Sequence, residues 1–397
     1  MRLFKPVVKR TDLQGMTPDV VGRSMRAGRR VVIFNWRDIT HPQAGGAERV
    51  THEIARRWVR DGHEITLFAA AYPGAAPHDV IDGVSVVRRG SQTTVHLAAR
   101  RYYEANWCGR CDLVIDEVNT IPFFAPLYVH EPVLMLNHQL AREVWMFEAP
   151  FPLNIIGFAS EPLYLQVYRH SPVMTISRSS LNSLSALGFH GPFYIIPMAV
   201  DTAAFAALPS LETKDDGLVL IFVGRVVPSK RVHDIVRALG RLHASGRTEA
   251  RLWIVGGWDD VYRRSLTRLI GSLGLTEAVT FFGRVDVVTK EDLMRRAHLC
   301  VMASIREGWG LVVTESARLG TPSVVYDVPG LRDSTIDGVT GRVCAPTPKA
   351  MATSIASLTA APEAYNQMRR VAWETASTLN WDETAHTAWR AVESCLS

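Results

Sequence analysis

The sequence predicts an α/β protein with two doubly wound domains, each a parallel sheet covered by helices. Short apolar runs alternate with amphipathic, helix-like stretches, which is typical of parallel sheets wrapped by helices. The alternation restarts after residue 200. The length of 397 residues is too great for one small core and suits two domains of about 200 residues each.

The first half begins with an expected strand at residues 31–34, a loop at 36–46 and a helix at 47–61 that ends at Gly62. Further strands are predicted at residues 65–68, 113–115, 133–136 and 173–176. We therefore place a first Rossmann-like domain at residues 30–197.

The second half starts with a six-residue apolar strand at 218–223. Further strands are predicted at residues 252–255, 279–282, 299–302 and 323–326. The second domain is placed at residues 198–380, and a last helix at 381–397. Open α/β sheets bind ligands at the carboxyl ends of their strands, so we expect the site in a cleft between the two domains.

Composition narrows the class of protein. Hydrophobic residues make up 47% and charged residues 21%, as in ordinary soluble proteins. No apolar run reaches the roughly 18 residues that would cross a membrane, and no secretory signal is expected. We therefore expect a cytoplasmic protein. Cys108 and Cys111 resemble a redox pair, but they precede a strand and no second pair exists, so neither redox nor metal function is expected.

Residues 1–29 form a basic N-terminal extension. Residues 1–30 hold eight basic and two acidic residues, so the rest of the chain is nearly neutral although the net charge is +5. A neutral body argues against a nucleic-acid-binding protein. The extension could contact an anionic membrane at its inner face, or it could be a solvated leader. Both interpretations stay open.

Residues 307–315 place two glutamates eight positions apart, with glycines between them, at the start of a helix expected over 310–318. Gly320 suits the helix end. A helix N-terminus attracts phosphate, and carboxylates accept hydrogen bonds from diols such as those of a sugar. The segment could thus hold an anion and a sugar together, or it could be two solvated glutamates.

Basic residues follow the strand at 218–223. Arg225 lies just after it, and Lys230 opens a helix expected over 230–244, with Ser229 as its N-cap. A lysine at a helix start opposes the macrodipole, which a bound anion would offset. Arg can grip a diphosphate at two points and Lys acts as a point charge. Diphosphate binding is therefore predicted, with a pair of exposed basic residues as the alternative.

These features resemble the retaining glycosyltransferases of family 4, which have the GT-B fold of two facing Rossmann-like domains. Four segments between residues 30 and 345 carry the resemblance. They are the diphosphate pair (Gly224-Arg225 with Lys230), the E-x7-E signature (Glu307 and Glu315), the glycine loop (Gly45 and Gly46) and the active-site histidine (His138).

The resemblance implies a role for each residue. Glu315 would hold the nucleotide ribose, Glu307 and His138 the donor hexose, and Arg225 and Lys230 the diphosphate. The base would lie near Arg284 and Val285, and the backbone of Gly308, Trp309, Gly310 and Leu311 would surround sugar and phosphate. Gly45 and Gly46 would let the backbone approach the diphosphate from the first domain. The last helix would cross back to the first domain.

The implied reaction is hexose transfer from a nucleotide-diphosphate sugar, a UDP-sugar in preference to a GDP-sugar, to a hydroxyl acceptor. Fixed cations and helix N–H groups would stabilise the leaving diphosphate, so neither a metal nor a cofactor is expected. Retention would come from same-face attack. Glu117 and Asn119 could line the acceptor site, and the aromatic stretch at 145–158 could receive a sugar, an aglycone or a lipid chain, or pack in the core. The oligomeric state is not predicted.

Three other functions fit parts of the sequence. A paired-carboxylate glycosidase would leave the Arg/Lys pair unused. An NAD(P)-dependent oxidoreductase lacks its Gly-x-Gly-x-x-Gly after the first strand. A catalytically inactive GT-B sugar-nucleotide-binding protein is the remaining alternative, and the intact glutamates and cations argue against it. Two departures from the family pattern are Ala199 at the domain join, where glycine is frequent, and Trp309, where phenylalanine is frequent.

Overall fold

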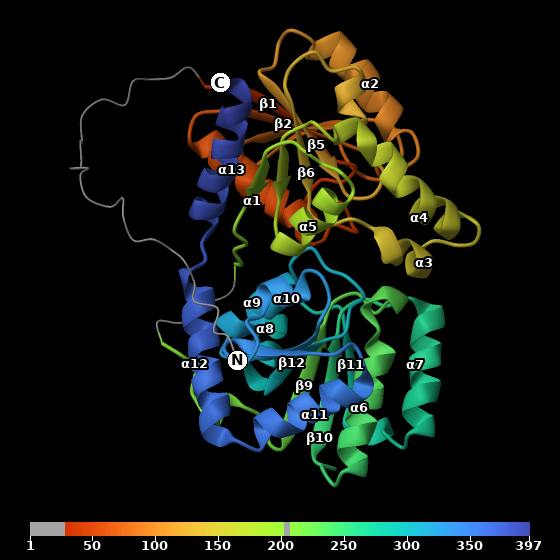
Figure 1. The fold of residues 1–397 in the computed structure, drawn as a ribbon, viewed down its shortest axis with the longest axis vertical. Coiled ribbons are helices and arrows are strands. Elements are labelled where there is room, and N and C mark those ends of the chain that lie inside the picture. The colour runs from red at the N-terminus through yellow and green to blue at the C-terminus, as the bar shows by residue number, and fades with distance from the viewer. Residues whose placement is uncertain (1–27, 202–206) are drawn as a thin grey trace, which may run out of the picture.

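The computed structural model describes residues 28–201 and 207–397 and contains two mainly parallel sheets, one in each half of the molecule (Figure 1). The first sheet has the strand order β3-β4-β2-β1-β5-β6-β7-β8, and the second has the order β11-β10-β9-β12-β13-β14. Within the sheets, β3 and β4 form an antiparallel pair. The fold class predicted from the sequence is confirmed.

The strands of the first sheet are β1 (Arg30–Phe34), β2 (Glu64–Ala69), β3 (His78–Ile81), β4 (Val84–Arg88), β5 (Leu113–Val118), β6 (Val133–Asn137), β7 (Val173–Thr175) and β8 (Phe193–Ile195). Those of the second are β9 (Leu218–Val223), β10 (Ala250–Val255), β11 (Val279–Gly283), β12 (Leu299–Met302), β13 (Ser323–Tyr326) and β14 (Gly341–Cys344). All ten predicted strands are present. The strands β3, β4, β8 and β14 were missed.

The helices that matter below are α1 (Gly46–Arg60), α2 (Val95–Asn106), α3 (Trp145–Glu148), α4 (Leu153–Tyr164), α5 (Arg178–Ala186), α6 (Val232–Ala244), α7 (Asp260–Ser272), α8 (Val287–Arg296), α9 (Leu311–Arg318), α10 (Leu331–Ser334), α11 (Pro348–Thr359), α12 (Pro362–Thr378) and α13 (Trp381–Leu396). The helices expected at residues 47–61 and 310–318 correspond to α1 and α9.

One predicted helix start was wrong. The helix expected from Lys230 begins at Val232, after a 3-10 turn at Pro228–Lys230. Arg231 adopts a left-handed conformation with φ of +49°, which separates the turn from α6. Ser229 is not the N-cap, because its hydroxyl donates a hydrogen bond to Glu148 and its carbonyl accepts one from the backbone of Ile305.

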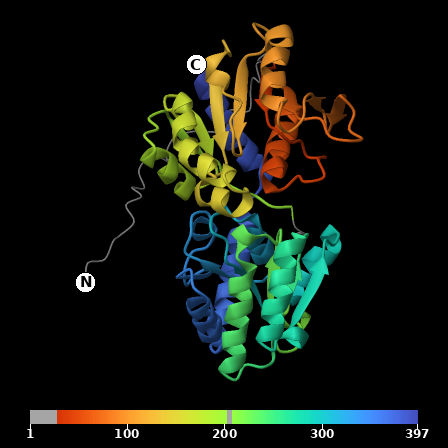
Figure 2. The same ribbon diagram turned by 90° about the vertical axis from the view of Figure 1, so that its right-hand side faces the viewer.

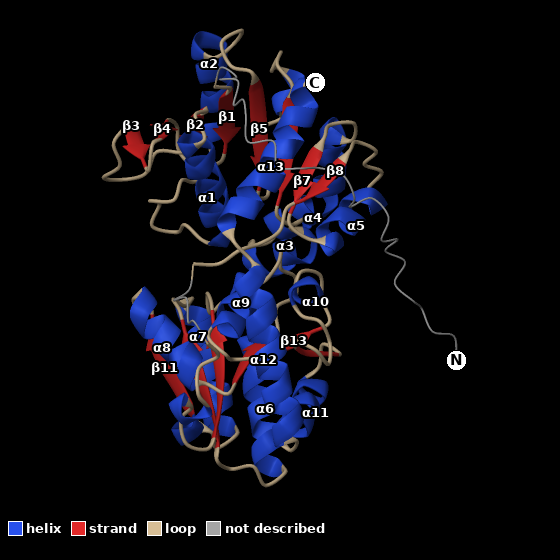
Figure 3. Ribbon diagram, turned by 90° about the vertical axis from the view of Figure 1, so that its left-hand side faces the viewer, coloured by secondary structure: helices blue, strands red, loops and turns tan. Residues whose placement is uncertain are grey.

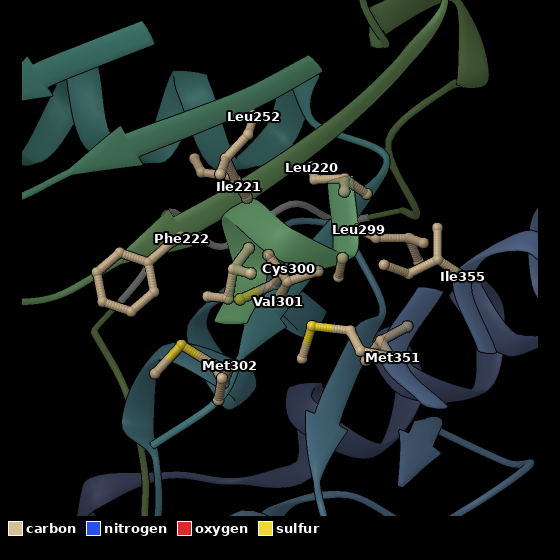
Figure 4. Packing of buried hydrophobic residues seen from close by; sticks show 14 of the residues in the cluster. Leu220, Ile221, Phe222, Leu252, Leu299, Cys300, Val301, Met302, Met351 and Ile355 are labelled. Carbon is tan, nitrogen blue, oxygen red and sulfur yellow. The ribbon is translucent and has the colours of Figure 1, made fainter. Parts of the chain in front are cut away.

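The second half is built around the apolar strand β9, all six residues of which are buried. Figure 4 shows Leu220 and Phe222 of β9 beside residues of β12, with Met351 of α11 next to them. A strand that is apolar on both faces is expected in the middle of a parallel sheet with helices on each side. This packing fixes the carboxyl end of β9, where Arg225 follows.

The chain crosses between the halves twice. It passes from β8 to β9 and returns between α12 and α13 (Figure 3). The last helix packs on α1, where the Trp58 indole N–H donates to the Ala385 carbonyl at 3.0 Å and Arg57 pairs with Asp382 at 2.9 Å. Ala199, in the first crossing, is buried and does not have a positive φ, so alanine is compatible with the backbone there.

The boundary drawn between residues 197 and 198 stays a prediction, because the strands on either side leave residues 196–217 between them. Residues 1–27 of the basic extension lie outside the described residues. Among the helices of the described ranges, none combines the length and apolarity needed to cross a membrane.

Candidate active site

Residues of both halves meet where α9 and α10 approach the first sheet. Figure 2 shows the yellow segment around α3 directly above the green helix α6. At the same boundary the backbone N–H of Ser179 on α5 donates to Asp333 on α10 at 3.0 Å. This contact joins the second half to the side of the first sheet where β6 and β7 end.

Glu307 lies in the loop before α9 and contacts a predicted partner directly. Its Oε1 accepts hydrogen bonds from Lys230 Nζ at 2.5 Å and from Ser304 Oγ at 2.6 Å. Both charged side chains are largely buried, with 14% and 18% of their surface exposed. The structure therefore brings together one member of the E-x7-E segment and one of the basic pair.

Arg225 projects from the carboxyl end of β9, after Gly224, and its side chain is 64% exposed. Its Nη2 lies 3.4 Å from each carboxylate oxygen of Glu148 on α3, and the Ser229 hydroxyl donates to the same carboxylate. A carboxylate of the first half thus occupies the space beside the predicted diphosphate-binding arginine. The sequence reasoning missed Glu148, whose signal was a lone acidic residue in the aromatic stretch 145–158.

The same segment makes a second contact across the boundary. Glu143 Oε2 lies 3.1 Å from Arg306 Nε, and Arg306 also donates to Ser183 of α5 at 3.3 Å. Residues 143–148 are therefore attached to the second half at two points. Of these two contacts, the one made by Glu148 involves Arg225, which is predicted to bind the diphosphate.

Glu315 lies in the second turn of α9, whose N-cap is Gly310. Its side chain is buried and its Oε2 pairs with Lys290 Nζ of α8 at 2.9 Å. Lys290 was not predicted. Arg284 is exposed, and its side chain lies over the backbone that follows β10. A Cβ at Gly257 would be 2.8 Å from Arg284 Nε. Val285 is half-buried against the core of the second half.

The loop of the E-x7-E segment contacts the first half through two glycines. A Cβ at Gly308 would lie 2.8 Å from the His138 carbonyl oxygen and 2.8 Å from Ile176 Cδ1. A Cβ at Gly46 would lie 3.0 Å from Leu311 Cδ1. The predicted glycine loop, the histidine and the E-x7-E segment are therefore neighbours in space. Trp309 and Leu311 also pack on the core of the first half, and the Trp309 indole N–H donates to Thr314 at 3.0 Å.

Gly45 precedes α1 and donates its backbone N–H to the Glu48 carboxylate at 2.7 Å. The other oxygen of Glu48 accepts from Arg37 Nε at 2.8 Å, and Arg37 also donates to the Gln43 carbonyl. These bonds hold the turn before α1 in place. The backbone of the glycine loop is thereby fixed against the start of α9.

His138 is 5% exposed and its Nε2 lies 3.1 Å from Glu117 Oε1. Glu117 is 1% exposed and also accepts a hydrogen bond from the Thr51 hydroxyl at 2.7 Å. Asn119 donates to Asn35 at 3.0 Å. The two residues predicted to line an acceptor site thus belong to a polar cluster next to His138, and the Glu117 carboxylate is not exposed.

Asp116 precedes Glu117 and faces the opposite side of the sheet. Burial raises its pKa to about 6, although hydrogen bonds from Tyr168 and from the backbone N–H groups of Ala125 and Phe123 act in the other direction. The contacts of Asp116 hold the loop after β5, so its role in the described structure is to order that loop.

The stretch at 145–158 is not core. Together with the rest of α4, the stretch exposes large apolar side chains on either side of Glu148 in the sequence. They are Met146, Phe147, Phe151, Leu153, Ile155, Ile156 and Leu163. Monomeric soluble proteins seldom expose so many apolar groups together without a binding role.

Two family models match the chain on either side of the first crossing. Residues 44–204 match the model described as Glycosyltransferase Family 4, and residues 206–374 match the model described as Glycosyl transferases group 1. Together the matches contain every predicted site residue. The glycine loop and the histidine lie within the first match, and the basic pair and both glutamates lie within the second.

Relatives and solved structures agree with these models. The chain is 34% identical over 187 residues to D-inositol 3-phosphate glycosyltransferase 2 of Catenulispora acidiphila, a match to 45% of this chain and 44% of that protein, so it spans less than half of that relative. It is 24% identical over 387 residues to a glycogen synthase of Mycobacterium tuberculosis, covering 90% and 92% of the two chains.

The fold matches the crystal structure of Anabaena HepE in complex with UDP and glucose, with a TM-score of 0.71 and 18% identity, over 92% of this chain and 100% of that one. This likeness concerns the fold. With the family models on both halves and the GT-B arrangement of the two sheets, the chain belongs to the family 4 type of glycosyltransferases.

Proposed function

We propose that this glycosyltransferase transfers a hexose, with retention and without a metal, from a nucleotide-diphosphate sugar to a hydroxyl acceptor. In this proposal residues 30–197 form the acceptor side and residues 198–380 bind the donor. A UDP-sugar is favoured as the donor. The enzyme would work in the cytoplasm or at the inner face of a membrane, on a cell-envelope or natural-product glycan.

The contact between Lys230 and Glu307 carries the proposal. A lysine ammonium and a carboxylate 2.5 Å apart, beside Arg225 and before the N-terminus of α9, supply groups for both parts of a sugar diphosphate. The lysine and the arginine would hold the diphosphate as negative charge develops on it. Glu307 would accept hydrogen bonds from sugar hydroxyls. Fixed cations take the part that a metal ion plays in other transferases.

The retaining outcome would follow from attack on the face that the diphosphate leaves. The acceptor hydroxyl forms the new bond to the anomeric carbon as the bond to the diphosphate oxygen breaks. Its proton passes to a phosphate oxygen of the leaving group, so the nucleoside diphosphate departs with that proton. No protein nucleophile is needed in this scheme.

The nucleotide would lie between α8 and α9. The pair of Glu315 and Lys290 is buried, and a carboxylate fixed by one lysine still has lone pairs for two ribose hydroxyls. The UDP and glucose bound to the fold relative HepE support a UDP-sugar as the donor.

The acceptor side would include the exposed apolar surface of α3 and α4. Phe151, at 79%, is its most exposed large apolar side chain, and Glu148 connects this surface to Arg225. An acceptor with an apolar part, such as a lipid-linked sugar or an aglycone, would bury this surface.

The direct test is a screen of UDP- and GDP-sugars for donor hydrolysis and transfer, preceded by thermal shifts with UDP, GDP and NAD. We expect stabilisation by UDP and none by NAD; stabilisation by NAD alone would refute the proposal. Lys230→Ala and Glu307→Ala should each lower kcat about 100- to 1,000-fold. Near-normal transfer by either variant would show that this site is assigned incorrectly.

A further inference from the structure

Three polar side chains continue the face of the first sheet that packs on α1. Val31 and Ile33 of β1, Ile115 of β5, and Leu136 of β6 belong to one core cluster together with residues of α1. Alternation along a strand places Asn35, Glu117 and His138 on that same face. It is also the face against which Trp309 and Leu311 pack, so these polar groups lie on the side of the sheet that the E-x7-E segment approaches.

Glu117 receives hydrogen bonds on both carboxylate oxygens. Oε2 accepts from the Thr51 hydroxyl at 2.7 Å, and Oε1 lies 3.1 Å from His138 Nε2 and 3.5 Å from Asn119 Nδ2. A buried carboxylate is stable when its oxygens are satisfied in this way. A carboxylate oxygen only accepts hydrogen bonds, so this contact favours the tautomer of His138 that carries its proton on Nε2.

The other ring nitrogen of His138 has no partner. Nδ1 is buried and makes no hydrogen bond to any residue in the described ranges. With the proton on Nε2, Nδ1 of a neutral imidazole carries a lone pair and accepts a hydrogen bond. A buried polar atom without a partner is unfavourable, so it is a place where a ligand group that donates a hydrogen bond gains affinity.

The position of His138 connects this nitrogen with the donor sugar. The backbone of Gly308 lies directly against the His138 carbonyl, and the Ser180 hydroxyl donates to the same carbonyl at 2.9 Å. Glu307 is the residue before Gly308. His138 is therefore fixed beside the segment that the proposed function assigns to the hexose.

We propose that Glu117 is a positioning residue that fixes the Nε2-protonated tautomer of His138, so that Nδ1 accepts a hydrogen bond from a hydroxyl of the transferred sugar. An ionised phosphate oxygen cannot donate to this nitrogen, whereas a sugar hydroxyl can. The inference rests on the proposed function, and it gives Glu117 a task other than acceptor binding.

The first experiment reads the tautomer without using activity. The chain has 13 histidines, so the signals of His138 in protein labelled with 15N-histidine are assigned by their loss in His138→Gln. We expect a protonated Nε2 and a bare Nδ1 in the free enzyme. A protonated Nδ1 in the wild type would overturn the inference, whatever the enzyme transfers.

The second experiment compares variants of Glu117. Glu117→Met removes the acceptor and should mix the tautomers. We expect it to lower kcat/KM for the donor about 10- to 100-fold, the range seen when a carboxylate that orients a metal-bound histidine is removed. Glu117→Gln still offers an oxygen to Nε2–H, so it should keep the tautomer and recover most of this loss. Thr51→Val is the matched control, because it deletes a bond to the same carboxylate without touching His138.

The outcomes separate this inference from the proposed function. Unchanged kcat/KM in Glu117→Met, with a wild-type melting temperature and mixed tautomers, would refute the positioning role. Equal losses in Thr51→Val and Glu117→Met would refute it too, since both would then report packing alone. If the wild type binds no UDP and hydrolyses no sugar nucleotide, the proposed function fails, and the tautomer result still stands.

Discussion

Replacing Glu148 with glutamine should increase the affinity of the enzyme for UDP. The Glu148 carboxylate lies 3.4 Å from Arg225 Nη2 and is bonded to Ser229, in the space proposed for the donor diphosphate. A diphosphate must therefore displace it before it can pair with Arg225. Glutamine keeps an oxygen for the Ser229 hydroxyl and removes the negative charge, so the substitution isolates the ionic part of the contact.

The expected gain is modest because Arg225 is exposed. An ion pair with a side chain that is 64% exposed contributes about 0.2–1 kcal/mol. Removing this competition should tighten UDP binding about 1.4- to 5-fold. Isothermal titration with UDP measures the change directly. The gain should shrink at high salt, since exposed pairs are screened, and it should be absent with uridine, which has no phosphate.

Glu143→Gln is the matched control. It breaks the pair with Arg306 at 3.1 Å in the same segment but leaves Arg225 and Glu148 in place. UDP affinity should then stay at the wild-type value. Equal gains in Glu143→Gln and Glu148→Gln would show that loosening the segment is the cause. Unchanged or weaker UDP binding in Glu148→Gln would refute the competition itself.

Three further predictions follow from individual contacts. Gly308→Ala should lower transfer about 5- to 150-fold, because the new Cβ would meet backbone and overpacking costs about 1–3 kcal/mol. Gly271→Ala, with open space around its Cβ, should leave kinetics unchanged, and equal kinetics in both variants would contradict the close approach. Lys290→Met removes the ion-pair partner of the Glu315 carboxylate, which is assigned to the ribose, so it should raise the donor KM more than it changes kcat. A loss confined to kcat would contradict the ribose assignment. Burial raises the pKa of Asp116 from 3.8 to about 6, so its contribution favours folding below about pH 4 and is lost as the pH rises through 6. Urea denaturation measures the free energy of unfolding at each pH between about 4 and 6. Over this range the free energy of unfolding should fall on the order of 3 kcal/mol more in the wild type than in Asp116→Asn. An equal pH dependence in the two proteins would contradict the shift.

Much of the fold was predictable because it is encoded locally. A strand such as β9 is a continuous apolar run, and α9 begins at a glycine and ends before Gly320, so each can be read from adjacent residues. The strands β3 and β8 were missed for the same reason. Neither has a buried residue, so neither shows an apolar run.

The site was predictable where one motif carries it, and not where two distant segments must meet. The E-x7-E segment and the basic pair each lie within nine residues, and their contact through Lys230 and Glu307 agrees with the prediction that they act together. Glu148 and Lys290 were missed because their partners lie 77 and 25 positions away. A single sequence does not show which residues far apart in the chain come into contact.

The helix start after β9 shows the same limit at shorter range. Ser229 has the residue type and position of an N-cap, but its hydroxyl is engaged by Glu148 of the other half. A tertiary contact thus overrides a strong local preference, and Arg231 takes the left-handed turn that lets α6 start later. Local propensity alone could not have revealed this.

The two crossings of the chain have a consequence for how the protein can be divided. A single proteolytic cut between β8 and β9 would leave both halves covalently joined through residues 379–380. A fragment ending near residue 200 would lack α13 and would expose the side of Trp58 that the last helix covers. We therefore expect the first half to be more stable when residues 381–396 are supplied with it, for example by a circular permutation that places this helix before β1.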